Sequence, residues 1–190
     1  AGIKYIPKES FAWCTSLNSF EWSSDEKNIE PEAFFKCPLE GFDFSNIRGI
    51  ADGAFSSWFD LESVKLPYGI RHIGESMFSH CTMLKSVCLP PGIVCIGYGA
   101  FDGCDLLQEI TIPDSVTSIE EAAFRGCRSL KNIIIPTNVV RIGVDAFAGC
   151  ESLKDIVIPD SVISIGNYAF SYCTALRSVN IGKNVVDIGL

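Results

Sequence analysis

Nine cysteines are the residues of this sequence with the greatest chemical potential, because thiols can bind metals, form disulfides or act as nucleophiles. Seven of them recur at nearly constant spacing, namely Cys14, Cys37, Cys81, Cys104, Cys127, Cys150 and Cys173. A zinc site needs four ligands that converge on one point, whereas equivalent residues of a repeat form a column of parallel side chains. Parallel side chains also disfavour the geometry of a disulfide. We therefore expect these seven cysteines to be reduced core residues that pack as small apolar groups.

Cys88 and Cys95 lie outside this column. Cys88 falls at an outward position of an expected strand, which predicts an exposed and reactive thiol. The pattern leaves the redox state of both residues open.

Catalytic chemistry has little support in the sequence. The only histidines are His72 and His80, and no serine or cysteine stands in a nucleophile motif. Gly97-Tyr98-Gly99 lacks the third glycine and the strand-to-helix context of a dinucleotide-binding loop. We therefore expect a protein that is not an enzyme, with no catalytic residue, no cofactor and no metal site.

The net charge also limits the classes of partner that the chain can bind. The chain has 190 residues with 23 acidic and 15 basic side chains, which gives a formal net charge of −8. A protein of this charge repels phosphate backbones and anionic lipid surfaces, so nucleic acid and membrane surfaces are disfavoured. No apolar run approaches the roughly 20 residues of a membrane-spanning helix, so no membrane insertion is expected in this segment.

Internal repetition is the dominant feature of the sequence. Phenylalanine recurs every 23 residues, with a single interval of 21, at Phe11, Phe34, Phe55, Phe78, Phe101, Phe124, Phe147 and Phe170. Alanine precedes most of these residues, the cysteine column follows three residues later, and leucine, valine or isoleucine occupy further fixed positions. The short interval fits two one-residue deletions in the second repeat, where Leu39, Phe42 and Phe44 keep the usual roles.

Each repeat has the pattern of one coil of a solenoid. In Ile133-Ile134-Ile135 the side chains alternate inward and outward, which predicts a short strand. Pro136 ends this strand, because proline has no N–H to donate to a sheet. A single coil cannot bury its apolar side, so neighbouring coils must stack and their strands pair in parallel. The sequence therefore predicts a β-rich parallel solenoid.

The unit from Ile112 to Pro136, I-P-x-S-V-x-x-I-x-x-x-A-F-x-x-C-x-x-L-x-x-I-x-I-P, resembles the BspA-like leucine-rich repeat. The resemblance extends over essentially the whole chain. It implies a right-handed coil with one short parallel strand per 23-residue repeat and about eight repeats. Proteins of this family are typically microbial surface or secreted proteins, which implies adhesion through protein ligands such as host matrix or surface proteins. The resemblance supplies no catalytic residues.

Two surfaces are candidates for ligand contact. Solenoids commonly bind along their sheet, where the middle residue of each expected strand points outward: Lys65, Cys88, Thr111, Ile134, Val157 and Asn180. The alternative for the apolar members is that β-branched residues simply favour strand formation. A second candidate patch is Trp58 with Phe59, which replaces the usual cysteine and its neighbour. The alternative there is that these aromatic rings fill the space left by the two deletions.

The sequence thus indicates one solenoid domain over residues 1–190. Because the repeat is still running at Leu190, we expect a fragment of a longer array. The favoured function is a non-catalytic protein-binding or adhesion module, located extracellularly or at the cell surface. Two alternatives stay open at this point: an intracellular, cytoplasmic interaction scaffold, and the recognition domain of a larger enzyme.

Overall fold

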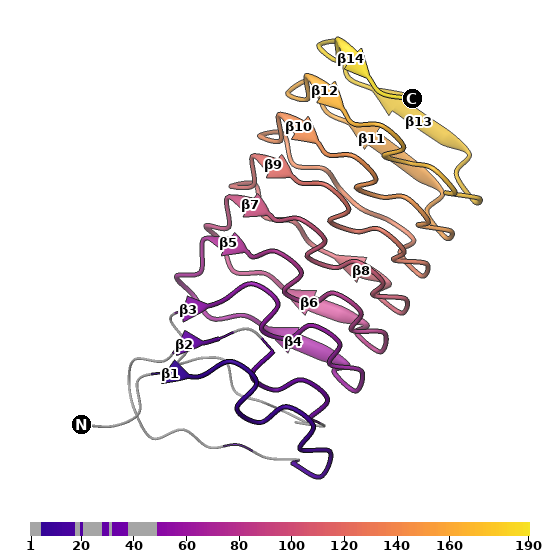
Figure 1. Cartoon of the computed structure of the whole chain (residues 1–190). Coiled ribbons are helices and arrows are strands. Elements are labelled where there is room, and N and C mark those ends of the chain that lie inside the picture. Colours follow the sequence, from indigo (N-terminus) through magenta and orange to yellow (C-terminus); the bar gives the residue numbers. More distant parts are fainter. Residues whose placement is uncertain (1–4, 18–19, 21–27, 31, 38–48) are drawn as a thin grey trace.

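The computed structural model describes residues 5–17, 20, 28–30, 32–37 and 49–190, and these wind into a parallel β-solenoid (Figure 1). The family resemblance and the repeat had predicted this fold class. The second repeat, which is two residues shorter than the others, was expected to place Leu39, Phe42 and Phe44 in the core. These three residues lie outside the part of the chain that the structure describes.

The strand expected in each repeat is present in five repeats of the described part of the chain. These strands are β4 (Ser63–Lys65), β6 (Ser86–Cys88), β8 (Glu109–Ile110), β11 (Asp155–Ile158) and β13 (Ser178–Ile181). They pair in parallel with partners 23 residues apart, as in Ser63 with Ser86. Residues 132–135 were expected to form a strand, but they do not form one. The expected single sheet is therefore two sheets, β4-β6-β8 and β11-β13.

A second class of short strand recurs once per coil, and its presence corrects the expectation of one strand per repeat. This class comprises β1 (Tyr5–Ile6), β2 (Asn28–Ile29), β3 (Gly49–Ile50), β5 (His72–Ile73), β7 (Cys95–Ile96), β9 (Ser118–Ile119), β10 (Arg141–Ile142), β12 (Ser164–Ile165) and β14 (Asp187–Ile188). Six of these strands, from β5 to β14, form one continuous sheet. The parallel pairing of Ile29 with Ile50 absorbs the 21-residue interval, so both isoleucines keep the same place in their coils.

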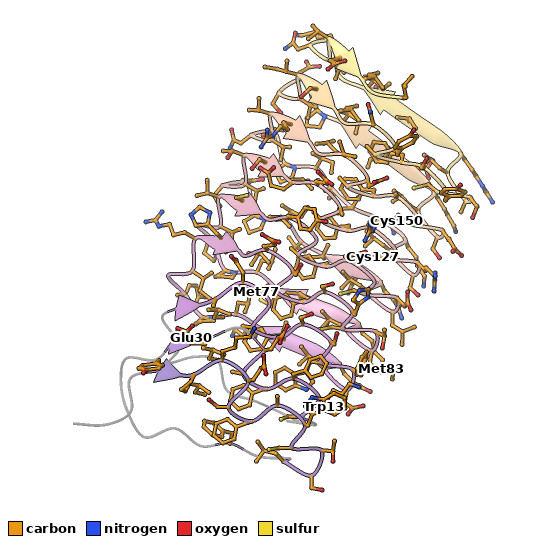
Figure 2. The ribbon with its side chains drawn as sticks, in the orientation of Figure 1. Trp13, Glu30, Met77, Met83, Cys127 and Cys150 are labelled. Carbon is orange, nitrogen blue, oxygen red and sulfur yellow. The ribbon has the colours of Figure 1, made fainter. Side chains whose placement is uncertain are left out.

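Stacked phenylalanine rings form the axis of the core. Phe101, Phe124, Phe147 and Phe170 follow one another at centroid distances of 5.3, 5.3 and 5.4 Å with nearly parallel planes. The alanine before each ring is small, which lets the chain turn tightly around it. Figure 2 shows how side chains fill the space enclosed by each coil, with Cys127 and Cys150 on successive coils.

A hydrogen-bonded turn segment carries the core phenylalanine and follows the two-residue strand of its coil. Around Phe124, the residues two before and two after it, Ala122 and Gly126, have φ angles of 54° and 70°. This alternation points every second N–H toward the next coil, where Ala122, Phe124 and Gly126 donate to the carbonyls of residues 144, 146 and 148 at 2.7–2.8 Å. The turn segments therefore stack by backbone hydrogen bonds and leave their outward side chains free to vary.

Candidate binding surfaces

All six residues of the predicted strand face are exposed. These residues are Lys65, Cys88, Thr111, Ile134, Val157 and Asn180. Their neighbours across the sheet are in register, with Lys65 beside Cys88 and Val157 beside Asn180. Ile134 is 83% exposed and Val157 is 61% exposed, so two large aliphatic side chains stand in water on one face. Exposed apolar groups of this kind release free energy when a partner covers them.

This stripe crosses from one sheet to the other. Lys65 and Cys88 belong to β4 and β6, while Val157 and Asn180 belong to β11 and β13. Thr111 follows β8, and Ile134 lies in the segment between the two sheets that has no strand assignment. The most exposed apolar side chain of the stripe is thus at the interruption of the sheet.

The predicted Trp58–Phe59 patch does not form, because Trp58 belongs to the core. Its indole is 1% exposed and lies 6.4 Å from the Phe34 ring and 5.7 Å from the Phe55 ring. Trp58 follows Phe55 at the place where other repeats have cysteine, and like most of those cysteines it is buried.

Phe59 instead joins an aromatic cluster that the sequence pattern did not reveal. The ammonium of Lys36 lies 4.1 Å from the centre of the Trp13 ring and 5.4 and 5.5 Å from the centres of Phe59 and Phe35. Cation–π attraction of this kind holds a lysine over aromatic faces. The cluster brings together side chains from three repeats, which only the stacking of coils makes neighbours.

The cysteine column is confirmed as core at six of its seven positions. Cys37, Cys81, Cys104, Cys127, Cys150 and Cys173 are buried and free. Each of these thiols donates to the carbonyl of the phenylalanine 26 residues earlier, as in Cys81 Sγ to Phe55 O at 3.1 Å and Cys127 Sγ to Phe101 O at 3.2 Å. The column therefore satisfies a row of buried carbonyls, and burial raises the pKa of the Cys81 thiol to about 12.

Cys14 was predicted to be a core residue, and this prediction is wrong. Its side chain is exposed. In the later repeats the cysteine instead donates to a phenylalanine carbonyl of the preceding coil, as Cys37 does to Phe11. Cys88 is exposed, as its outward strand position predicted, and Cys95 is partly buried.

Thiol labelling should reproduce this division. We expect Cys14 and Cys88 to react rapidly with Ellman's reagent in the native protein, and the six buried cysteines to react only after denaturation, because only exposed thiols meet the reagent. Absorbance at the thionitrobenzoate band counts the thiols, and the variants Cys14→Ser and Cys88→Ser should each remove one fast thiol. After both substitutions, fast reaction of any thiol other than the partly buried Cys95 would contradict the buried column.

A polar cluster on the six-stranded sheet surrounds Cys95. The Ser118 hydroxyl donates to the Cys95 sulfur at 3.4 Å, and the Cys95 thiol lies 3.9 Å from Oε1 of Glu120. Arg141 donates to both carboxylate oxygens of Glu120 at 2.8 Å. Burial alone would raise the pKa of Glu120, but the hydrogen bonds from Arg141 and Ser118 outweigh it and lower that pKa.

This cluster lacks the chemistry of a nucleophilic site. Burial raises the pKa of the Cys95 thiol and the charge of Glu120 raises it further, so the thiol stays protonated at neutral pH. One sequence signal could have located the cluster: Glu120 interrupts a column in which other repeats have glycine, as at Gly97 and Gly143. The arrangement is an ion pair across two strands.

Metal binding and membrane crossing can be addressed for the described part of the chain. There, no three histidine, cysteine, aspartate or glutamate side chains come together in a way that could hold a metal ion. No helix among the same residues is long and apolar enough to cross a bilayer.

The repeat itself can be compared with known proteins now that its geometry is established. The BspA type leucine-rich-repeat region, in six copies, matches residues 4–129 and 95–190. The chain belongs to the BspA-type leucine-rich-repeat family. This repeat is a protein-interaction fold.

Solved structures similar to this BspA-type chain are bacterial. A leucine-rich-repeat protein of Treponema pallidum is 35% identical, with a TM-score of 0.63 over 68% of this chain and 69% of that protein. A leucine-rich cell surface protein of Faecalibacterium prausnitzii is 31% identical, with a TM-score of 0.67 over 94% of this chain and 57% of that protein. A leucine-rich-repeat protein of Bacteroides ovatus shares the fold at 24% identity and a TM-score of 0.56, over 98% of this chain and 66% of that protein.

The BspA-type chain thus spans little more than half the length of the F. prausnitzii protein. No curated protein sequence matches it.

Proposed function

We propose that this BspA-type domain is a non-catalytic protein-binding module of a microbial cell-surface or secreted protein, and that it binds its partner through the strand face. The observation that carries this proposal is the exposure of Ile134 and Val157 on an otherwise polar face. The two side chains lie on successive coils whose backbones are fixed by the stacked core. Binding of a partner therefore costs little conformational entropy at this site.

The surroundings of these two residues resemble a small protein interface. The residues beside the stripe are exposed and polar: Ser86, Glu109, Asn132, Asp155 and Ser178. An apolar centre with a polar rim is the usual arrangement of a protein-binding patch. The family relationship to a cell surface protein of F. prausnitzii supports the location.

A charge-introducing double variant tests the proposal. We expect Ile134→Lys together with Val157→Lys to weaken binding to the partner about 10-fold to 100-fold, because two charged side chains at the centre of the interface would have to lose their hydration. This loss of affinity corresponds to about 1.4–2.8 kcal/mol. Binding would be measured by surface plasmon resonance against immobilised extracellular matrix proteins and against surface proteins captured from host cells.

Val140 and Ile163 provide a matched control. They are exposed β-branched residues, 44% and 49% accessible, outside the strand face and next to the six-stranded sheet. Val140→Lys with Ile163→Lys changes the net charge by the same amount and should leave binding unchanged. Equal loss in both double variants, or loss in the control alone, would remove the strand face as the binding surface.

One observation favours a second candidate, an intracellular interaction scaffold. All nine cysteines are free, two of them exposed, and exposed free thiols are more usual in reducing compartments. Fractionation of the native host cells decides between the two: recovery in the cytosol supports the scaffold, and recovery at the surface or in the medium supports the adhesion module.

A further inference from the structure

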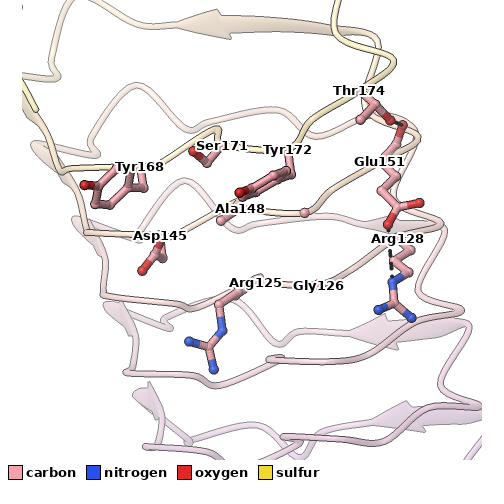
Figure 3. Close-up of a pocket in the computed structure, with 11 residues that line it drawn as sticks. Arg125, Gly126, Arg128, Asp145, Ala148, Glu151, Tyr168, Ser171, Tyr172 and Thr174 are labelled. Carbon is pink, nitrogen blue, oxygen red and sulfur yellow. Dashed lines mark hydrogen bonds and ion pairs between the residues drawn. The ribbon is translucent and has the colours of Figure 1, made fainter. Parts of the chain in front are cut away.

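A groove of about 600 Å³ lies on the turn segments of the last three repeats, away from the strand positions. Its lining comes from three successive coils: Arg125 and Arg128 from one, Asp145 and Glu151 from the next, and Tyr168 and Tyr172 from the third (Figure 3). These residues lie within four positions of a core phenylalanine, and their side chains are exposed or partly exposed. The groove is therefore distinct from the strand face proposed above.

Glycine forms the floor of this groove. Gly126 and Gly149 occupy the second position after their phenylalanines, with φ angles of 70° and 73°, and they stack directly on one another. Their N–H groups donate to the carbonyls of Ala148 and Ser171 at 2.7 Å, so the floor has no free backbone donors. A peptide strand consequently could not add to the floor by backbone hydrogen bonding.

Two exposed tyrosines rise at the edge of the glycine floor. Tyr172 is 81% exposed and Tyr168 is 53% exposed, and both have left-handed backbone conformations with φ angles of 57° and 58°. A bulky side chain is disfavoured in that region. The repeat does not require these rings, because the equivalent positions elsewhere hold residues such as Gly, Ser, Ala and Asp. The left-handed conformation itself belongs to the repeat, because residues such as Trp13, Ala122 and Asp145 share it, so only the choice of tyrosine distinguishes these two positions.

The two arginines of the groove are already paired. Arg125 donates to both oxygens of Asp102 at 3.0 and 2.6 Å, and Arg128 lies 3.3 Å from Asp105 and 3.4 Å from Glu151. A pair of arginines compensated in this way does not favour an anionic ligand. What the groove presents is a set of fixed, planar hydrogen-bonding groups beside two aromatic faces.

We propose that this groove binds a neutral oligosaccharide. A pyranose ring has an apolar C–H face that stacks on an aromatic ring and an equatorial rim of hydroxyls that both donate and accept. Tyr172 and Tyr168 provide the stacking faces, and Asp145, Glu151 and Arg128 lie where they can bond the hydroxyls. An open, shallow groove suits a chain of sugar units, because each coil adds one more set of side chains along it.

Isothermal titration of the whole chain with three neutral hexasaccharides, cellohexaose, mannohexaose and chitohexaose, tests the proposal. We expect at least one of them to bind, and Tyr172→Ala and Tyr168→Ala each to weaken that binding by about 10-fold or more. Tyr68→Ala is the matched control, because Tyr68 is 78% exposed and lies outside the groove. It should leave binding unchanged.

The variant Tyr172→Gly distinguishes a loss of sugar binding from a loss of folding. Glycine relieves the left-handed conformation of residue 172 while removing the ring, so the thermal midpoint should be maintained while sugar binding is lost. Absence of binding for all three sugars, or an equal effect of Tyr68→Ala, would overturn the proposal. Strong weakening of the binding between about 0.05 and about 0.5 M NaCl would do so as well, because salt screens a charged ligand and not a neutral one.

The strand-face variants test whether the sugar site is separate from the proposed protein-binding site. Ile134→Lys with Val157→Lys should leave the titration with the sugar unchanged, since neither residue lines the groove. Loss of sugar binding in that double variant would place the sugar site on the strand face and overturn the assignment to the groove.

Discussion

Raising the pH from about 9 to about 10 is expected to lower the free energy of unfolding by about 4 kcal/mol, because unfolding releases protons from buried thiols. Cys81, Cys104, Cys127 and Cys150 are fully buried, each 0% exposed. Burial raises the pKa of each of these thiols above the ordinary value of 9.0. For a domain of this size such a loss is a large fraction of the total stability.

The direction of the effect follows from the protons bound in each state. Below pH 9 the thiols are protonated in the folded and the unfolded chain alike, so the stabilisation is fully present. Above pH 9 the unfolded chain forms thiolates while the folded chain keeps its protons, and stability falls by up to about 1.4 kcal/mol per thiol and pH unit. The loss continues until the folded thiols titrate, which for Cys81 occurs at about 12.

Urea unfolding followed by circular dichroism at pH 8, about 9 and about 10, with a reductant present, measures this dependence. Cys127→Ala should reduce the slope of stability against pH by about one proton, whereas Cys88→Ala should not change it, because Cys88 is exposed. Equal slopes for the wild-type chain and Cys127→Ala would show that the buried column is not the source of the alkaline instability.

Phe124→Ala is expected to destabilise the fold by about 3–5 kcal/mol. The Phe124 ring is 0% exposed and lies between Phe101 and Phe147 at centroid distances of 5.3 Å on both sides. Removing the ring leaves a cavity that the flanking coils cannot close, because their backbones are held by hydrogen bonds such as Phe124 N to Ala146 O. Since each coil of a solenoid contacts only its neighbours, the defect also weakens the coupling between the two halves.

The corresponding measurement is urea unfolding at pH 7, in which Phe124→Ala should lower the midpoint and broaden the transition. Ile134→Ala is the control, because Ile134 is 83% exposed and its truncation should change stability by less than about 0.5 kcal/mol. A loss below about 1 kcal/mol for Phe124→Ala would mean that the stacked rings are not the axis of the core.

Much of the core could be predicted from the sequence because the stacking of coils turns a sequence period into a column. Phe124 and Cys127 were assigned to the core from spacing alone, and both are fully buried. The errors concern Cys14 and the Trp58–Phe59 pair. Cys14 is exposed although it keeps the spacing of the column, and Trp58, next to the shortened repeat in the sequence, is buried in the core.

The second strand of each coil could not be recognised from the pattern. Strands such as β5 and β9 contain two residues, which is too short for an alternation of apolar and polar side chains to be visible. The absence of a strand at residues 132–135 was equally hidden, because Ile133-Ile134-Ile135 has the same alternation as neighbouring repeats that do form strands. Nothing in the structure explains that difference.

The nine cysteines show what the sequence determined and what the tertiary structure determined. The sequence alone predicted a column of seven cysteines in a solenoid of the BspA type, and six of them are buried as expected, because fixed spacing along a repeating chain becomes fixed position in space. Only the tertiary structure decided which thiols are buried, that Glu120 and Arg141 meet beside Cys95, and that Tyr168 and Tyr172 border a groove with Arg128 and Glu151. The physical reason is that these contacts join residues one or two coils apart, where the repeat specifies the positions but leaves the outward side chains free.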